Sequence, residues 1–257
     1  MKSKDLQLAL DAAEKAGQII RDGFGKISTF ERKIGKGIVT EIDKKAEAAI
    51  VAILQKSSYP ILGEESGFVG KKSDTYWVVD PLDGTNNFFR QVDLIATAIA
   101  LIKENEVVLG VIESPLKNLT YFAEKGNGAY RNSERINVSN RQIQDTIITT
   151  NYGYGTKAVA MYKNATSILL DKVQKIRHLG TSALELCYVA QGSYEAFLSF
   201  GDELWDYAAG LILVEEAGGK VTDWKGNPWN NSNSFVLTSN GLIHLYLVHL
   251  VENLQSG

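Results

Sequence analysis

The spacing of apolar residues changes along the chain and predicts different secondary structure in different regions. Over residues 4–22 the apolar positions recur at helical intervals until Gly23 interrupts them, which predicts an opening amphipathic helix. A second helix is predicted at about 41–57. Short runs rich in β-forming residues follow, with turn residues between them, and they indicate an antiparallel meander. The predicted strands of this meander cover residues 75–80, 94–103, 106–113 and 119–124.

Beyond residue 146 predicted strands and helices alternate, which is typical of α/β layering. The strands are predicted at 146–150, 174–178, 194–199 and 234–238, and the helices at 157–170, 181–191, 205–217 and 241–253. The polar stretch 140–145 therefore divides an α+β half, residues 1–145, from an α/β half, residues 146–257. The chain contains no fixed repeat and no Pro/Gly/Ser-rich linker, so we expect residues 1–257 to form a single unit.

Composition and charge exclude several classes of protein. The 257 residues are 44% hydrophobic and 22% charged, which suits a globular protein with a large core. The net charge of −3 provides no general attraction to nucleic acid or to an anionic membrane. The longest apolar run, Leu94 to Ile102, is about half the ~20 residues of a membrane span, and the N-terminus does not resemble a signal peptide. The lone cysteine, Cys187, agrees with a reducing compartment, so we expect a cytoplasmic protein.

Two aspartates accompany a strong turn signal in the sequence WVVDPLDGTNNF, residues 77–88. Pro81 and Gly84 interrupt a buried strand, so Asp80 and Asp83 are expected at its carboxyl end on a tight turn. Both carboxylates are then free to point to one place, and an all-oxygen cluster suits Mg²⁺. The alternative interpretation is that Asp-Pro-x-Asp-Gly forms only a turn.

The same segment offers further groups for binding a phosphate ester and its metal ions. The carbonyl of Leu82 lies between the two aspartates in sequence and would be free to act as a third oxygen ligand. The amides of Gly84 and Thr85 would begin a short helix, where a phosphate oxygen binds favourably.

Other carboxylates occur at two further element boundaries. Glu64 and Glu65 follow a short apolar strand at 59–62, and Asp206 follows Trp205 at the start of an apolar helix. Each has an ordinary alternative: the glutamate pair would face solvent, and Asp206 would stabilise the first turn of its helix.

Taken together, these segments resemble the inositol monophosphatase family. This family belongs to the magnesium-dependent, lithium-sensitive phosphatases, which also include fructose-1,6-bisphosphatases and 3′-phosphoadenosine 5′-phosphate phosphatases. The motifs that carry the resemblance span nearly the whole chain: VTEID at 39–43, GEES at 63–66, WVVDPLDGTNNF at 77–88, GTSA at 180–183, WDYAAG at 205–210, EEAGG at 215–219 and TSNGLIH at 238–244.

The resemblance implies an architecture and a set of functional residues. The fold would be a layered α/β/α/β/α sandwich of the sugar phosphatase type, assembled as a homodimer. Two or three Mg²⁺ ions would be held by Glu64, Asp80, the Leu82 carbonyl, Asp83 and Asp206, with Glu65 as an outer partner. Asp43 and Thr85 would orient and deprotonate a water that attacks phosphorus in line, without a phosphoenzyme.

The spacing of the aspartates agrees with the absence of covalent chemistry. A haloacid-dehalogenase phosphatase places its second Asp two residues after the first, whereas the spacing between Asp80 and Asp83 is three. A P-loop sequence is also absent.

Residues that differ from the family pattern bear on the substrate. Phosphate contacts are expected from Gly84 and Thr85, and the remaining substrate contacts from Asp83, Gly180, Thr181, Ser182, Ser199 and Asp206. Animal members carry a glutamate that binds inositol hydroxyls at the position of Ser199, so we expect weaker or broader polyol selection. Asn87 is usual in the monophosphatases. Asp202 and Glu203 would repel a second phosphate, which favours monophosphate substrates.

A basic segment near residue 37 leaves one property of the metal site open. In the family this segment is commonly a mobile flap that carries part of the environment of the third metal ion. Here it contains Arg32, Lys33 and Lys36, and the affinity for a third ion is therefore not determined by the pattern.

The resulting prediction is a Mg²⁺-dependent phosphomonoesterase for inositol monophosphate or a related small polyol or sugar monophosphate, with no membrane partner. One alternative is a fructose-1,6-bisphosphatase or a nucleotide (PAP/NADP) phosphatase of the same superfamily. Another is a binding protein that retains the site, because some bacterial members associate with the transcription machinery; a nucleic-acid or transcription partner thus stays open. The presence of every expected ligand favours catalysis.

Overall fold

The computed structural model describes residues 2–33, 37–231 and 235–252, so Lys36 and one end residue of each of the predicted elements 234–238 and 241–253 lie outside the described residues. The helices are α1 (Lys4–Gly23), α2 (Glu41–Leu54), α3 (Thr85–Phe89), α4 (Thr156–Leu170), α5 (Ser182–Ala190), α6 (Leu204–Glu216) and α7 (His244–Val251). Short 3-10 helices cover Gln55–Ser57 and Ile143–Asp145.

The described strands form a hairpin and two sheets. The hairpin consists of β1 (Glu31–Lys33) and β2 (Gly37–Val39). The larger sheet contains β3 (Ile61–Gly63), β4 (Gly67–Val69), β5 (Thr75–Asp83), β6 (Ala96–Lys103), β7 (Glu106–Ser114), β8 (Leu119–Glu124), β9 (Ala129–Arg131) and β10 (Glu134–Ile136). The smaller sheet contains β11 (Ile147–Tyr152), β12 (Lys175–Arg177), β13 (Ala196–Phe200), β14 (Lys220–Thr222) and β15 (Leu237–Ser239).

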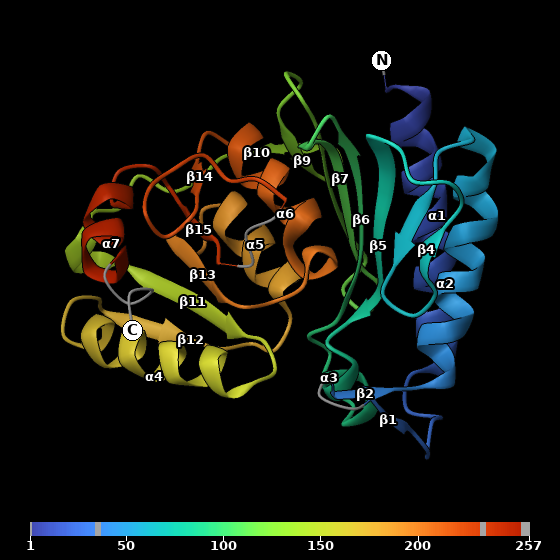
Figure 1. Cartoon of the computed structure of the whole chain (residues 1–257), viewed down its shortest axis with the longest axis horizontal. Helices are drawn as coiled ribbons and strands as arrows, with labels where there is room; N and C mark the ends of the chain where they lie inside the picture. The colour runs from blue at the N-terminus through green and yellow to red at the C-terminus, as the bar shows by residue number, and fades with distance from the viewer. Residues whose placement is uncertain (1, 34–36, 232–234, 253–257) are drawn as a thin grey trace.

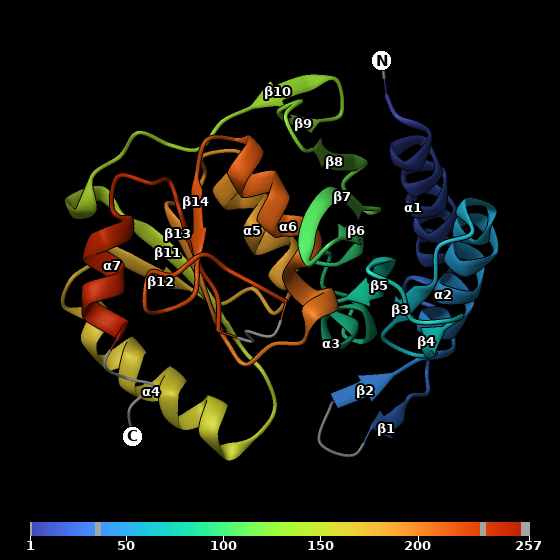
Figure 2. The same cartoon turned by 45° about the horizontal axis from the view of Figure 1, so that its top comes forward.

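Helices and sheets alternate as layers across the molecule (Figure 1). From one side to the other, α1 and α2 are followed by the larger sheet, α5 and α6, the smaller sheet, and α4 with α7 (Figures 1 and 2). This arrangement confirms the predicted α/β/α/β/α sandwich. No helix of the described residues is both long enough and apolar enough to cross a bilayer.

The larger sheet is buried on both faces. Strands β5 to β8 form the predicted antiparallel meander, which β9 and β10 extend, and β3 joins β5 in parallel. One face packs against the apolar sides of α1 and α2, where Ala13 and Ile50 are fully buried. The opposite face shares a core with α5 and α6. Because these helices come from the second half of the chain, both halves contribute to one core; that they form one catalytic unit stays a prediction.

The strand that carries the two aspartates is longer than predicted. Its pairing with β6 is irregular between Asp80 and Asp83, and it resumes where Asp83 lies opposite Ala96. The prediction that the strand ends at Asp80 was therefore wrong. The reason is that the β-bulge accommodates Pro81, whose carbonyl accepts a hydrogen bond of 2.9 Å from the Thr97 hydroxyl.

The smaller sheet has mixed strand directions. Strands β12, β11 and β13 run parallel, whereas β15 and β14 are antiparallel to their neighbours. The four strands predicted in this half correspond to β11, β12, β13 and β15. Strand β14 was missed because its three residues carry no alternating pattern and directly follow Gly218 and Gly219.

Candidate active site

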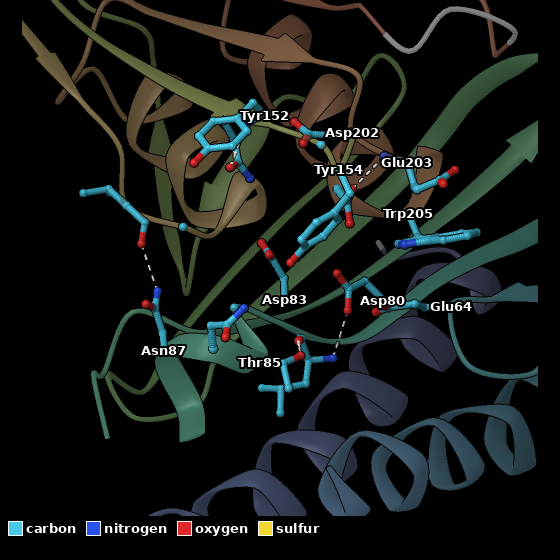
Figure 3. Close-up of a pocket in the computed structure, with 18 of the residues that line it drawn as sticks. Glu64, Asp80, Asp83, Thr85, Asn87, Tyr152, Tyr154, Asp202, Glu203 and Trp205 are labelled. Carbon is cyan, nitrogen blue, oxygen red and sulfur yellow. Dashed lines mark hydrogen bonds between the residues drawn. The ribbon is translucent and has the colours of Figure 1, made fainter. Parts of the chain in front are cut away.

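Both sheets contribute to a pocket of about 680 Å³. Eight of the site residues expected from sequence line it: Glu64, Asp80, Leu82, Asp83, Gly84, Thr85, Gly180 and Asp206. Figure 3 shows Asp80 and Asp83 of β5 near Glu64, which follows β3. The fold thus brings together the three sequence segments that contain carboxylates.

The two aspartates of β5 are held by different hydrogen bonds. Asp80 is 2% exposed, and its Oδ1 accepts the Leu82 amide at 3.0 Å. Oδ2 of Asp83 accepts the Thr181 hydroxyl and the Ala183 amide, each at 2.7 Å. Since Ala183 lies in the first turn of α5, Asp83 binds the positive end of that helix. This contact joins β5 to the second half of the chain.

Asp43 and Thr85, the pair expected to act on water, are in direct contact. The Thr85 hydroxyl lies 2.8 Å from Oδ1 of Asp43 and 3.0 Å from the Leu82 carbonyl, and it donates its single proton to one of them at a time. The other carboxylate oxygen, Oδ2, accepts the Thr40 amide at 2.8 Å in a capping box that begins α2. Asp43 is 1% exposed, so the orientation of its carboxylate is fixed.

Gly84 permits the turn that presents Thr85. It has φ of +87°, and a Cβ atom on it would lie 2.9 Å from the Leu94 carbonyl oxygen. Both facts exclude a larger residue at this position. Next to it on α3, the Asn87 amide bridges the Leu94 and Leu179 carbonyls at 2.8 and 2.9 Å, which ties α3 to the loop before α5.

The two glutamates of the GEES motif share a lysine. Nζ of Lys33 lies 2.8 Å from Glu64 and 2.5 Å from Glu65. Burial by itself would lower the pKa of Lys33, but Glu64 and Glu65 together raise it, so the ammonium stays charged. The predicted alternative of a solvated glutamate pair is therefore wrong: both side chains are largely buried and ion-paired.

A buried glutamate that the sequence interpretation missed supports this motif. Glu47 accepts the amides of Glu65 and Ser66 at 2.9 and 2.7 Å. A Cβ atom on Gly63 would lie 2.6 Å from the Glu47 carboxylate, so only glycine fits there. The available signal was position: Glu47 lies one helical turn after Asp43 on the buried face of α2.

Asp206 has the ordinary helix-stabilising contact that was its alternative interpretation. Its Oδ2 accepts the Glu203 amide at 2.7 Å, which forms a capping box at the start of α6. It also lines the pocket, so the helix contact positions the carboxylate without removing it from the site.

Four residues expected to contact phosphate or substrate occupy different depths. Gly180 lines the pocket, whereas Thr181, Ser182 and Ser199 are fully buried. The Thr181 hydroxyl binds Asp83, and the Ser199 hydroxyl donates to Asp202 at 2.8 Å. Ser199 thus contacts Asp202, which lines the pocket.

A model of the inositol monophosphatase family matches residues 1–256. The chain belongs to this family. Its members are metal-dependent phosphatases, and the assignment agrees with the resemblance stated above.

The relatives and the solved structure described next each match most of the length of this chain. It is 36% identical over 256 residues to the fructose-1,6-bisphosphatase/inositol-1-monophosphatase of Thermotoga maritima, covering 96% of this chain and 95% of that one. It is 38% identical over 229 residues to the Nus factor SuhB of Pasteurella multocida, covering 86% and 85%. The crystal structure of the suppressor protein suhB of Bartonella henselae superposes with a TM-score of 0.91 at 33% identity, covering 97% and 99%.

The donor groups of the pocket fit the hard metal ion that the family uses. Burial is the largest cause that raises the pKa of Asp80, Asp83 and Asp206, and neighbouring carboxylates add to it; the pKa of Asp83 reaches about 7. Oxygen donors whose charges repel one another in a buried site are stabilised by a divalent cation. Among the described residues, however, no three His, Cys, Asp or Glu side chains already stand in a metal-binding arrangement.

Two observed contacts already engage predicted ligands. Lys33 occupies the carboxylate of Glu64, and the Glu203 amide occupies one oxygen of Asp206. A metal ion bound by Glu64 would therefore compete with Lys33, whereas Asp206 keeps its other oxygen for an ion. The assignment of Glu64, Asp80, the Leu82 carbonyl, Asp83 and Asp206 as ligands, with Glu65 outside them, stays a prediction.

Several pocket residues were not assigned to the substrate from sequence. They are Arg90, Asn151, Tyr152, Tyr154, Asp202 and Trp205. Asp202 carried a usable signal, because it is an acidic residue just after a buried strand. The others lie on or next to α3, β11 and α6, and local sequence patterns do not contain the packing that brings these elements to the pocket.

Proposed function

We propose that this protein hydrolyses small polyol or sugar monophosphates with two or three Mg²⁺ ions. The observation that supports this most directly is the 2.8 Å hydrogen bond from Thr85 to Asp43 beside the buried carboxylates of the pocket. It joins a proton acceptor to a hydroxyl that faces the substrate space, in a family of phosphatases. Thr85, Asp43 and the metal-binding carboxylates are the proposed catalytic groups.

The proton of the attacking water would leave by way of Thr85. Its hydroxyl oxygen receives a proton from the water while its own proton passes to Oδ1 of Asp43. Burial is the largest of the influences on the pKa of Asp43. It raises this pKa, which makes the carboxylate a stronger base. The oxygen of the water bonds to phosphorus, the ester P–O bond breaks, and the alcohol departs with a proton from solvent.

The remaining residues would bind and orient the ester. Gly84 and Thr85 line the pocket at the start of α3, and their amides would bind phosphate oxygens. Mg²⁺, held by the predicted ligands, would supply the positive charge that polarises the phosphate and acidifies the water.

Phosphate release from a panel of esters tests the proposal. We expect hydrolysis of inositol 1-phosphate that requires Mg²⁺ and is inhibited by Li⁺. Thr85→Ala should lower kcat by about 10²-fold or more, because it removes the proton path. Thr120→Ala is a matched control, since its hydroxyl also donates to a carboxylate, that of Glu113, away from the pocket. The absence of phosphate release from every ester would contradict the proposal.

A second proposed function is binding to the transcription machinery, because several relatives at 36–38% identity are named Nus factor SuhB. The assay is capture of purified bacterial RNA polymerase by the immobilised protein. Binding that persists in Asp83→Asn, while phosphate release is lost, would show a role separate from catalysis. A lack of binding by the wild-type protein would contradict this second proposal. Assembly as a homodimer is proposed from the family and is tested by light scattering.

A further inference from the structure

Asp202 is a buried carboxylate that faces the pocket but is not among the predicted metal ligands. It lies between β13 and α6 and is 5% exposed, yet it forms part of the pocket wall. In Figure 3 it lies beside Tyr152 at one end of the drawn site, whereas Thr85 and Asp80 lie toward the other end. A carboxylate in this position is costly to desolvate unless hydrogen-bond donors compensate it.

The protein supplies donors to only one of its two oxygens. Ser199 and Ser182 donate to Oδ2 at 2.8 and 3.4 Å, and both serines are fully buried. The Asn151 amide donates in turn to the Ser182 hydroxyl at 2.6 Å. No hydrogen bond from another described residue reaches Oδ1. The network therefore fixes the carboxylate and leaves one oxygen for a ligand.

The backbone around Asp202 is also fixed in place. The amide of Gly153 donates to the Phe200 carbonyl at 3.1 Å, and a Cβ atom on Gly153 would overlap the carbonyl of Gly201. The two loops that flank Asp202 are thus in close contact, and the carboxylate cannot easily withdraw from the pocket.

The charges near Asp202 indicate what kind of ligand suits it. Within the described residues it forms no ion pair, and the neighbouring charged groups with which it interacts include the acidic Asp83, Glu203 and Asp206. A phosphate would be repelled here. A neutral hydroxyl group can donate a hydrogen bond to the carboxylate and so offset its cost of desolvation. Such a bond to a charged acceptor is stronger than a hydrogen bond between two neutral groups.

We infer that Asp202 accepts a hydrogen bond from a hydroxyl of the substrate's alcohol part and selects polyol phosphates over esters without such a hydroxyl. This assignment rests on the proposed phosphatase function. It also changes the expectation drawn from Ser199: the strong acceptor is present three residues later in the chain, and Ser199 positions it.

The test is the ratio of kcat/KM for myo-inositol 1-phosphate to kcat/KM for p-nitrophenyl phosphate, which has no hydroxyl. We expect Asp202→Asn to lower this ratio by about 10- to 100-fold, chiefly through KM for the inositol ester. Ser199→Ala should lower it less, because the carboxylate remains but is less well oriented. Asp223→Asn is the matched control, since Asp223 also accepts from neutral donors but lies in a turn outside the pocket.

Each other outcome has a distinct meaning. A ratio unchanged in both Asp202→Asn and Asp202→Ala, in folded protein as judged by thermal unfolding, would overturn the assignment while the phosphatase function stands. An equal loss on both esters with a raised Mg²⁺ requirement would also overturn it, because Asp202 would then be a metal ligand. If the wild-type protein hydrolyses neither ester, the proposed function is wrong and this assignment falls with it.

Discussion

The two sides of the pocket are built in different ways. On the side of the larger sheet, Asp80, Asp83 and Thr85 all lie within residues 80–85. Asp80 and Thr85 are oriented by bonds to this segment and to Asp43, whereas Asp83 is held by Thr181 and Ala183 from the second half of the chain. On the side of the smaller sheet, Asp202 is oriented by side chains from two other positions, Ser182 and Ser199. Most groups proposed for the chemistry thus come from one short segment of sequence, whereas the donors that orient Asp202 come from two separate elements, β13 and α5. A change on the second side can alter the substrate without altering the reaction.

The largest predicted effect tests whether Asp206, on the side of the smaller sheet, takes part in the chemistry. Asp206 comes from the second side, but we expect it to act with Asp83 as a metal ligand. Asp83→Asn and Asp206→Asn should each lower Mg²⁺-dependent kcat/KM by at least about 100-fold, because each removes several kcal/mol of charge stabilisation. The measurement is phosphate release, with folding checked by circular dichroism. Full activity in Asp206→Asn would mean that the side of the smaller sheet contributes only to recognition of the substrate.

Part of this division was predictable from sequence. The spacing Asp-Pro-x-Asp-Gly-Thr determines which groups meet on β5 and α3, and a pattern of six residues contains that information. Glu47 and Lys33 could not be assigned in this way, because their contacts with the GEES motif span 18 and 31 residues. Asp202 was noticed as an acidic residue, but its burial and its two serine donors depend on how β13 and α5 pack.

The next prediction concerns the stability of the metal-free protein, because the first side concentrates largely buried acids with raised pKa values. Burial raises the pKa of Asp83 and of Glu65 to about 7 from ordinary values of 3.8 and 4.5. A carboxyl group with a raised pKa in the folded state favours folding at low pH, and this contribution is lost as the pH rises through the folded pKa. In EDTA, Tm should therefore fall between pH 4 and pH 7.

Mg²⁺ and one variant separate this effect from general pH dependence. At pH 8 the addition of Mg²⁺ should restore Tm, since the ion compensates the ionised carboxylates. Asp83→Asn should show a shallower decrease of Tm in EDTA, because its amide oxygen keeps both hydrogen bonds but does not ionise. A variant curve as steep as that of the wild type would contradict the assignment of Asp83 to this titration.

A smaller effect is expected from Lys33, which competes with metal on the first side. Lys33→Met should lower the Mg²⁺ concentration for half-maximal activity by up to about fivefold, the effect of a partly exposed ion pair. Lys44→Met is the control, because Lys44 pairs with Glu31 on the surface at 2.7 Å. A raised Mg²⁺ requirement would show instead that Lys33 holds Glu64 in a geometry that favours metal binding.

The smallest predicted effect concerns Arg90, an exposed cation at the pocket rim that forms no ion pair with another described residue. Sequence reasoning placed only acidic residues at this rim, so Arg90 reduces the repulsion expected for a second phosphate. Arg90→Ala should lower kcat/KM for fructose 1,6-bisphosphate about two- to fivefold more than for inositol 1-phosphate, and less at high salt because the charge is exposed. Arg135→Ala, an exposed arginine of β10 outside the pocket, is the control. An equal decrease on both esters would mean that Arg90 attracts the phosphate that they share, and the choice between mono- and bisphosphates would then depend on Asp202 and Glu203.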